Sequence, residues 1–68
     1  MTDAQKELIL NRYNICCENY WDAVAREDME SATNWSYKIR GMASVLQVLG
    51  FEVDWDSEYK YIVDVVKK

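Results

Sequence analysis

The amino-acid sequence predicts an all-α fold: a small three-helix bundle in which a long helical hairpin, residues 3–49, is closed by a short C-terminal helix. Three observations support this prediction. Proline is absent and glycine occurs only twice in 68 residues, so few residues interrupt a helix. Apolar residues recur at three- and four-residue spacing through most of the chain. Half of the residues are hydrophobic, which predicts that residues 1–68 fold as a single helical domain.

The first predicted helix runs from Asp3 to about Arg26, and Thr2 or Asp3 is suited to cap its N-terminus. Its apolar residues follow steps of four, three, four and four, through Ile9, Tyr13, Cys16, Tyr20 and Val24. Consecutive helical residues point about 100° apart, so one of the neighbouring thiols of Cys16 and Cys17 is expected to face the core and the other its flank. We therefore predict structural cysteines rather than reactive ones.

The second predicted helix runs from Met29 to Leu49, with Asp28 as its N-terminal cap. The most regular apolar series in the chain lies in this helix and consists of Ala32, Trp35, Ile39, Met42, Leu46 and Leu49. This spacing is typical of a helix packed along one face of a neighbour. It predicts that the main core contains Trp35, Ile39, Met42 and Leu46.

A second face of this helix is also small or apolar, and its members are Tyr37, Gly41, Ser44 and Val48. We therefore expect the helix to have neighbours on two sides. Glycine in mid-helix costs roughly 1 kcal/mol relative to alanine. A close approach by another backbone would explain that cost, so Gly41 is predicted to mark a tight helix contact.

The last 19 residues begin at Gly50, which is suited to the left-handed conformation that ends a helix. Residues 51–55 alternate apolar and acidic side chains, which predicts an extended connector with one apolar face. We expect this connector to be hydrated coil anchored to the bundle. Pairing with a second copy or with the sheet edge of a partner is the alternative. After Asp56 as cap, helical spacing predicts a third helix, through Tyr59, Ile62, Val63 and Val66.

The side chains give no support for catalysis or for metal binding. The chain has no histidine, and its two adjacent cysteines cannot form a tetrahedral zinc site. Acidic residues at 54, 56 and 58 resemble the opening of a calcium-binding EF-hand loop, but Tyr59 and Val65 occupy the positions that need glycine and glutamate. We therefore expect neither an enzyme nor a cofactor.

The charge distribution argues against a nucleic-acid-binding protein. The formal net charge is −4, and the predicted third helix opens with Asp56 and Glu58, which would repel phosphate. Lys38 and Arg40 form the only basic patch near aromatic residues. No apolar stretch reaches the 18 or so residues that span a bilayer, and the acidic start is unlike a signal peptide. We therefore expect a cytoplasmic protein with no direct contact to nucleic acid or membrane.

Nine aromatic residues are more than a core of this size can hide, and exposed tyrosine and tryptophan are common at protein interfaces. The sequence therefore predicts a small acidic protein–protein interaction module. The expected partner-binding residues are Glu52, Asp54, Trp55, Asp56, Glu58 and Tyr37. Their carboxylates favour a partner with a basic surface, and a homodimer is the other possibility. The alternative function is an acidic inhibitor, of the kind made by phages and mobile elements, that mimics nucleic-acid charge and blocks a nucleic-acid-binding protein.

Overall fold

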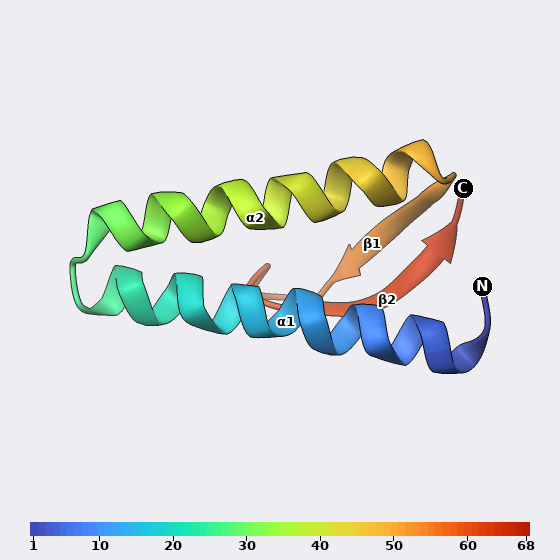
Figure 1. The fold of residues 1–68 in the computed structure, drawn as a ribbon. Helices are drawn as coiled ribbons and strands as arrows, with labels where there is room; N and C mark the ends of the chain where they lie inside the picture. The colour runs from blue at the N-terminus through green and yellow to red at the C-terminus, as the bar shows by residue number, and fades with distance from the viewer.

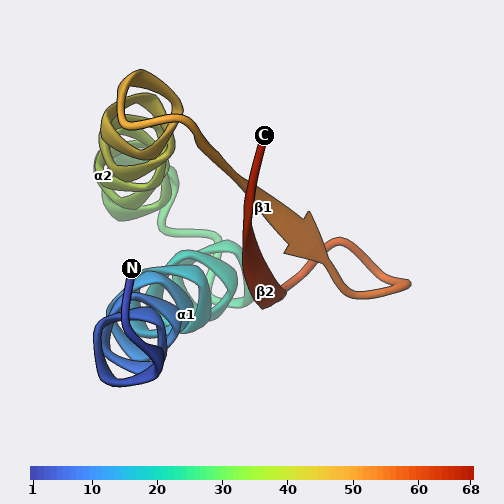
Figure 2. The same ribbon diagram turned by 90° about the vertical axis from the view of Figure 1, so that its right-hand side faces the viewer.

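The computed structural model describes all residues from Met1 to Lys68 and contains two helices and two strands. Helix α1 (Asp3–Ala25) and helix α2 (Met29–Val48) form one layer, and strands β1 (Phe51–Trp55) and β2 (Ile62–Lys67) form an antiparallel hairpin. The hairpin packs on one side of the helix pair (Figures 1 and 2). The fold is therefore α+β, and the prediction of an all-α three-helix bundle is wrong.

Helix α1 begins at a capping box, in which the side chain of each of two residues accepts a hydrogen bond from the backbone N–H of the other. The backbone N–H of Gln5 donates to Thr2 Oγ1 at 3.1 Å, and the backbone N–H of Thr2 donates to Gln5 Oε1 at 2.9 Å. Of the two predicted caps, Thr2 is the one that the structure uses. The end of the helix at Ala25 lies one residue from the predicted end.

The caps of helix α2 also agree with the sequence. The carboxylate of Asp28 accepts the backbone N–H of Ser31 at 3.2 Å, and hydrogen bonds from the side chain of Ser31 and then from its backbone lower the pKa of the carboxyl group. Glu27 before it adopts a left-handed φ of 59°, which tightens the turn between the helices. Gly50 has a φ of 88°, so the predicted left-handed residue after the helix is confirmed.

The two helices lie closest near their connecting turn and diverge toward the end that carries both termini (Figure 1). Ala23 and Ala32, on either side of the turn, are fully buried, and their short side chains allow this close approach. The larger core residues lie farther along the helices, where the hairpin packs. Residue size thus gives the helix pair the shape of a V, and the hairpin covers one face of it.

Strand β1 occupies the residues predicted as an extended connector, but its neighbour is β2, in the segment predicted as a third helix. The register pairs Phe51 with Lys67 and continues to Asp54 opposite Asp64. Neither hydrated coil nor pairing with another molecule is needed, because the chain supplies the second strand itself. The extended conformation predicted for residues 51–55 is therefore confirmed, whereas the prediction of hydrated coil there and that of a third helix after Asp56 are wrong.

A β-bulge explains why strand β2 resembled a helix. The register shifts after Asp54, so that Trp55 pairs with Ile62 and one residue of β2 is left without a partner. The shift buries Ile62 and Val65, which are three residues apart as on a helix face. The β-branched content of the strand was the contrary signal, with valine or isoleucine at 62, 63, 65 and 66.

Asp56 caps a turn in the hairpin loop and not a helix. Its side-chain Oδ1 accepts the backbone N–H of Lys60 at 2.9 Å, and its carbonyl oxygen accepts the N–H of Tyr59 at 3.1 Å. Tyr59 adopts a left-handed φ of 57°, which lets the loop reverse direction. The prediction that Asp56 acts as a cap is therefore confirmed, but the prediction that it caps a helix is wrong.

The core consists of five buried residues from both helices and strand β2, namely Tyr13, Cys17, Leu46, Ile62 and Val65. Of the four residues predicted for the core, Leu46 lies in it, and Ile39 and Met42 pack against it from the side. Trp35 is only half-buried and lies outside this cluster. The hairpin supplies the apolar side chains expected from a third helix, so the centre of the core lies between β2 and α1. Cys17 is buried and Cys16 half-buried, as predicted.

The second apolar face of α2 has no neighbour within the chain. Tyr37 and Val48 are 64% and 84% exposed, and a β-carbon added to Gly41 would meet no atom within 4 Å. The prediction of a tight contact at Gly41 is therefore wrong, because the only layer that packs on α2 besides α1 is the hairpin.

Strand β2 is attached to α1 by the side chain of Asn14. The Asn14 Nδ2 donates to the carbonyl oxygen of Ile62 at 2.9 Å, and the N–H of Ile62 donates to Asn14 Oδ1 at 2.8 Å. One amide side chain thus satisfies both backbone groups of a strand residue, as a neighbouring strand would. Nearby, Lys6 Nζ lies 3.0 Å from the carboxylate of Asp64, and this hydrogen bond lowers the pKa of Asp64.

Replacing Asn14 with alanine is expected to lower the free energy of unfolding by about 1–3 kcal/mol, because both backbone groups of Ile62 lose their partner. Asn19→Ala is the matched control: it lies in the same helix, and its side chain bonds only the carbonyl of Ile15, one turn earlier. Its effect should stay within about 0.5 kcal/mol. Urea unfolding followed by circular dichroism measures both, and equal effects would show that the Asn14 bridge contributes nothing specific.

Candidate functional site

An open groove runs between α1 and α2. It has a volume of about 850 Å³, and the ten residues that line it are Leu8, Ile9, Arg12, Cys16, Lys38, Gly41, Met42, Val45, Leu46 and Leu49. We call this set the helix groove. None of these residues belongs to the hairpin. The hairpin covers the helix layer on one side only (Figure 2).

The helix groove is apolar and solvent-accessible. Leu8, Val45 and Leu49 are 55%, 61% and 63% exposed, respectively. At the wide end of the V the groove continues into a second hollow of about 410 Å³, which Met1 and Phe51 help to line. Aliphatic side chains exposed side by side mark a surface that gains free energy when another apolar surface covers it.

The only charged residues in the helix groove are the cations Arg12 and Lys38. Neither of them takes part in a salt bridge within the chain. Lys38 Nζ lies 4.2 Å from the centroid of the Trp35 ring, so its partner is an aromatic face and not a carboxylate. The groove therefore has local positive charge on a chain whose net charge is −4.

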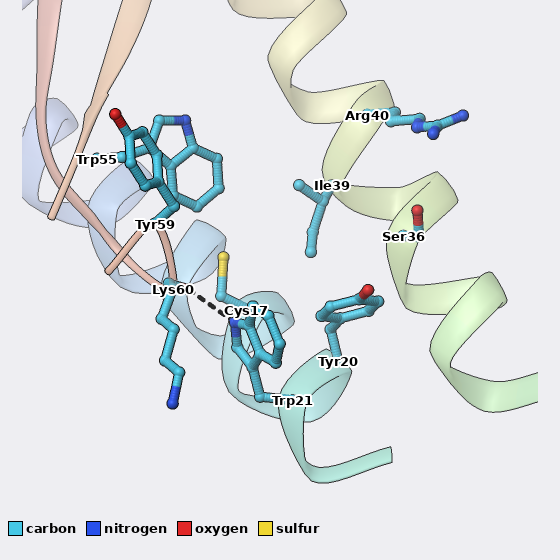
Figure 3. Close-up of a pocket in the computed structure, with 9 residues that line it drawn as sticks. All are labelled: Cys17, Tyr20, Trp21, Ser36, Ile39, Arg40, Trp55, Tyr59 and Lys60. Atoms are coloured by element: carbon cyan, nitrogen blue, oxygen red, sulfur yellow. Dashed lines mark hydrogen bonds between the residues drawn. The ribbon is translucent and has the colours of Figure 1, made fainter. Parts of the chain in front are cut away.

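A separate pocket, which we call the aromatic pocket, lies between the hairpin loop and the two helices (Figure 3). It has a volume of about 200 Å³ and is lined by Cys17, Tyr20, Trp21, Ser36, Ile39, Arg40, Trp55, Tyr59 and Lys60. The indole Nε1 of Trp21 donates to the carbonyl oxygen of Lys60 at 3.1 Å and so fixes the loop to α1. Figure 3 shows the charged ends of Arg40 and Lys60 directed away from the pocket.

The aromatic pocket is small, and its thiol is buried. Its volume is below the roughly 300–1,000 Å³ of ordinary small-molecule sites. Its one thiol is that of Cys17, and burial, followed by the nearby Cys16 and Asp56, raises the pKa of that thiol to about 11. A thiol in this state is a poor nucleophile near neutral pH. No cluster of three histidine, cysteine, aspartate or glutamate residues is placed to hold a metal ion.

The structure places the six predicted partner-binding residues in four environments. Glu52, Asp54 and Glu58 are exposed on the hairpin, and Glu58 lies 3.8 Å from Lys60 Nζ. Trp55 is half-buried, with its ring 5.8 Å from that of Tyr13 in an edge-to-face contact. Asp56 caps the loop turn.

Tyr37, the sixth of these residues, is exposed on α2 and lines neither the helix groove nor the aromatic pocket. The five hairpin residues thus share one element, and Tyr37 does not join them. Their role in binding stays a prediction.

The sequence analysis did not bring the residues of the helix groove together as one site. Leu8 and Val45 belong to none of the apolar series identified in the sequence. A second apolar face on each helix was the available signal. It could not be interpreted without knowing that the hairpin covers the helix layer on one side only.

Comparison with protein-family models, with curated protein sequences and with solved structures finds no match for this chain. Its function is therefore inferred from its own residues. None of the helices combines the length and the apolar composition that crossing a membrane requires.

Replacing Gly41 with alanine is expected to raise the free energy of unfolding by about 0.5–1 kcal/mol, because alanine favours a helix and the added β-carbon meets open space. Gly50→Ala is the control glycine. Its φ of 88° is unfavourable for alanine, so this change should destabilise the fold. Thermal and urea unfolding measure both variants. A loss of stability in Gly41→Ala would reveal a close contact that the structure lacks.

The stability of the fold is expected to fall as the pH rises from about 9 toward 12. Burial is the main cause that raises the pKa of Tyr13 to about 12 and that of Cys17 to about 11, from ordinary values of 10.0 and 9.0. Between these values the unfolded chain loses protons that the folded chain retains, so unfolding becomes more favourable. Below about pH 8 both groups are almost fully protonated in both states, and their contribution is constant.

Urea unfolding at a series of pH values measures this decline. Tyr13→Phe keeps the ring and removes the titrating hydroxyl, so its stability should fall less steeply above pH 10. Tyr37→Phe, at an exposed tyrosine, is the control and should follow the wild-type profile. Identical profiles for all three proteins would contradict the burial of the Tyr13 hydroxyl.

Proposed function

We propose that this chain is a protein-binding module whose docking surface is the helix groove. The observation that carries the proposal is the groove itself, an open apolar surface of about 850 Å³ between two helices. Protein interfaces have an apolar centre with polar groups at the rim, and in the groove Leu8, Val45 and Leu49 provide the apolar part. Arg12 and Lys38 provide the polar groups.

The extent of the exposed surface supports the proposal. The chain exposes 4967 Å², whereas a compact monomer of 8.0 kDa is expected to expose about 4,450 Å². Its radius of gyration is 12.3 Å, against about 11 Å for a compact domain of this length. Only seven residues are buried. The domain therefore has much uncovered apolar surface for its size, and a bound partner would cover part of it.

The geometry of the groove favours a helical ligand. Two walls of side chains, one from each helix, form a channel that can hold the apolar face of a third helix. A globular partner with a flat surface would contact the rims and leave the floor, which includes Met42 and Leu46, uncovered. The groove therefore supports binding of an amphipathic helix.

The alternative function, an acidic inhibitor that mimics nucleic acid, has less support. Such a protein needs evenly spaced free carboxylates on one face. In the hairpin, Asp64 is paired with Lys6 and Asp56 is used by the loop turn. The cations at 60, 67 and 68 interrupt the remaining carboxylates.

A partner purified from cells that make this chain naturally is expected to lose affinity when the groove is made polar. Val45→Gln should weaken binding by roughly tenfold or more, because it removes the burial of one valine side chain. Val63→Gln is the matched control, because Val63 on β2 is 59% exposed and Val45 is 61% exposed. Isothermal titration calorimetry with the purified partner measures both.

The control should bind within twofold of the wild type. If Val63→Gln weakened binding as much as Val45→Gln, or more, the docking surface would be the hairpin and the proposal would be wrong. Circular dichroism of both variants checks that each one is folded before its affinity is compared.

A further inference from the structure

We propose that the occupant of the helix groove is an amphipathic helix of a different protein, with carboxylates on both sides of its apolar stripe. This inference rests on the proposed function and adds the chemistry of the partner. It is independent of the prediction of a basic partner, which depends on the hairpin carboxylates and concerns another surface.

Charge complementarity is the main argument. Arg12 is on the α1 wall and Lys38 on the α2 wall of the groove, and no carboxylate is among the ten lining residues. Residues 31–50, which include the whole α2 wall, contain two cations and no acid. Because neither Arg12 nor Lys38 has a carboxylate partner within the chain, each one is available to a carboxylate of the ligand.

The shape of the groove suits a helix at this position. With a rise of about 1.5 Å per residue, Arg12 and Gly41 lie at nearly the same height, about 18–20 Å from the turn. Gly41 itself adds no side chain to the groove wall, and a β-carbon at this residue would meet nothing within 4 Å. A ligand helix can therefore approach α2 closely at the point where Arg12 faces it across the groove.

A second copy of the chain is a poorer occupant. A two-fold contact centred on the groove brings the same patch of both molecules together. It would bring Arg12 and Lys38 of both molecules into one contact, with four cations and no carboxylate. The nearest acids of α1 are Glu7 and Glu18, which lie about 120–140° around the helix from Arg12 and so point away from the groove.

The proposal is tested by selection from a displayed library of 18-residue helical peptides. The apolar positions are fixed as leucine at helical spacing, and the flanking positions are an equal mixture of glutamate, lysine and glutamine. The wild-type chain should enrich glutamate at the flanks. The charge-reversed variant Arg12→Glu/Lys38→Glu should enrich lysine instead. Circular dichroism shows whether this variant is folded, and sedimentation shows whether each protein is a monomer.

A peptide selected by the wild-type chain is then synthesised and titrated against both proteins. Charge reversal should weaken the binding of this peptide by about tenfold, which corresponds to the loss of two modest ion pairs. Raising the salt concentration should reduce the difference in affinity between the wild-type chain and the charge-reversed variant. Val45→Gln should weaken the same peptide, and Val63→Gln should not.

The outcomes separate the two proposals. Selected peptides that are sensitive to Val45→Gln but show no charge preference would overturn this inference and leave the proposed function intact. Peptides that are insensitive to Val45→Gln, or a selection that enriches nothing, would overturn both. A wild-type chain that sediments as a dimer with its groove protected would identify the second copy as the occupant and overturn the inference.

Discussion

The structure depends on one constraint, which is that a single short hairpin must cover a layer of two long helices. Helices of 23 and 20 residues extend about 30–35 Å, whereas strands of five and six residues extend about 17–20 Å. The hairpin can therefore pack on one face of the layer and over part of its length. The core forms on that face, between Tyr13 and Cys17 of α1 and Ile62 and Val65 of β2. The opposite face of the helix pair keeps its apolar residues but has nothing to pack against.

Because the hairpin is so short, its position on the helices depends on a few contacts, and those of the Asn14 side chain are among them. A two-stranded sheet has two free edges, and a chain of this size has no third strand to cover them. The amide of Asn14 covers one position of β2, and the Lys6–Asp64 pair lies along the same strand. The hairpin is thus positioned by polar contacts at its edge and by apolar contacts on its face. A partner that binds only the folded chain, in the helix groove, would raise the free energy of unfolding and so stabilise a fold that has a small core.

Much of the helical layer could be predicted from the sequence, because its signals are local. Thr2, Asp28 and Gly50 each act through groups within a few residues, and all three have the predicted roles. Strand β2 could not be predicted from periodicity alone, because the bulge after Asp54 places Ile62 and Val65 three residues apart. The mid-helix position of Gly41 and the exposed Val45 depend on which face the hairpin covers, and spacing along the chain does not contain that information.

The central claim is that the face of the helices away from the hairpin binds a helical ligand. The most direct test is a map of backbone amide chemical shifts in the ¹⁵N-labelled chain, recorded during titration with a glutamate-flanked helical peptide. The proposal predicts shift changes confined to the groove residues of α1 and α2, between Leu8 and Cys16 and between Lys38 and Leu49. The amides of Val63 and of the hairpin loop should stay in place. Changes centred on the hairpin, with the groove amides unaffected, would contradict the claim.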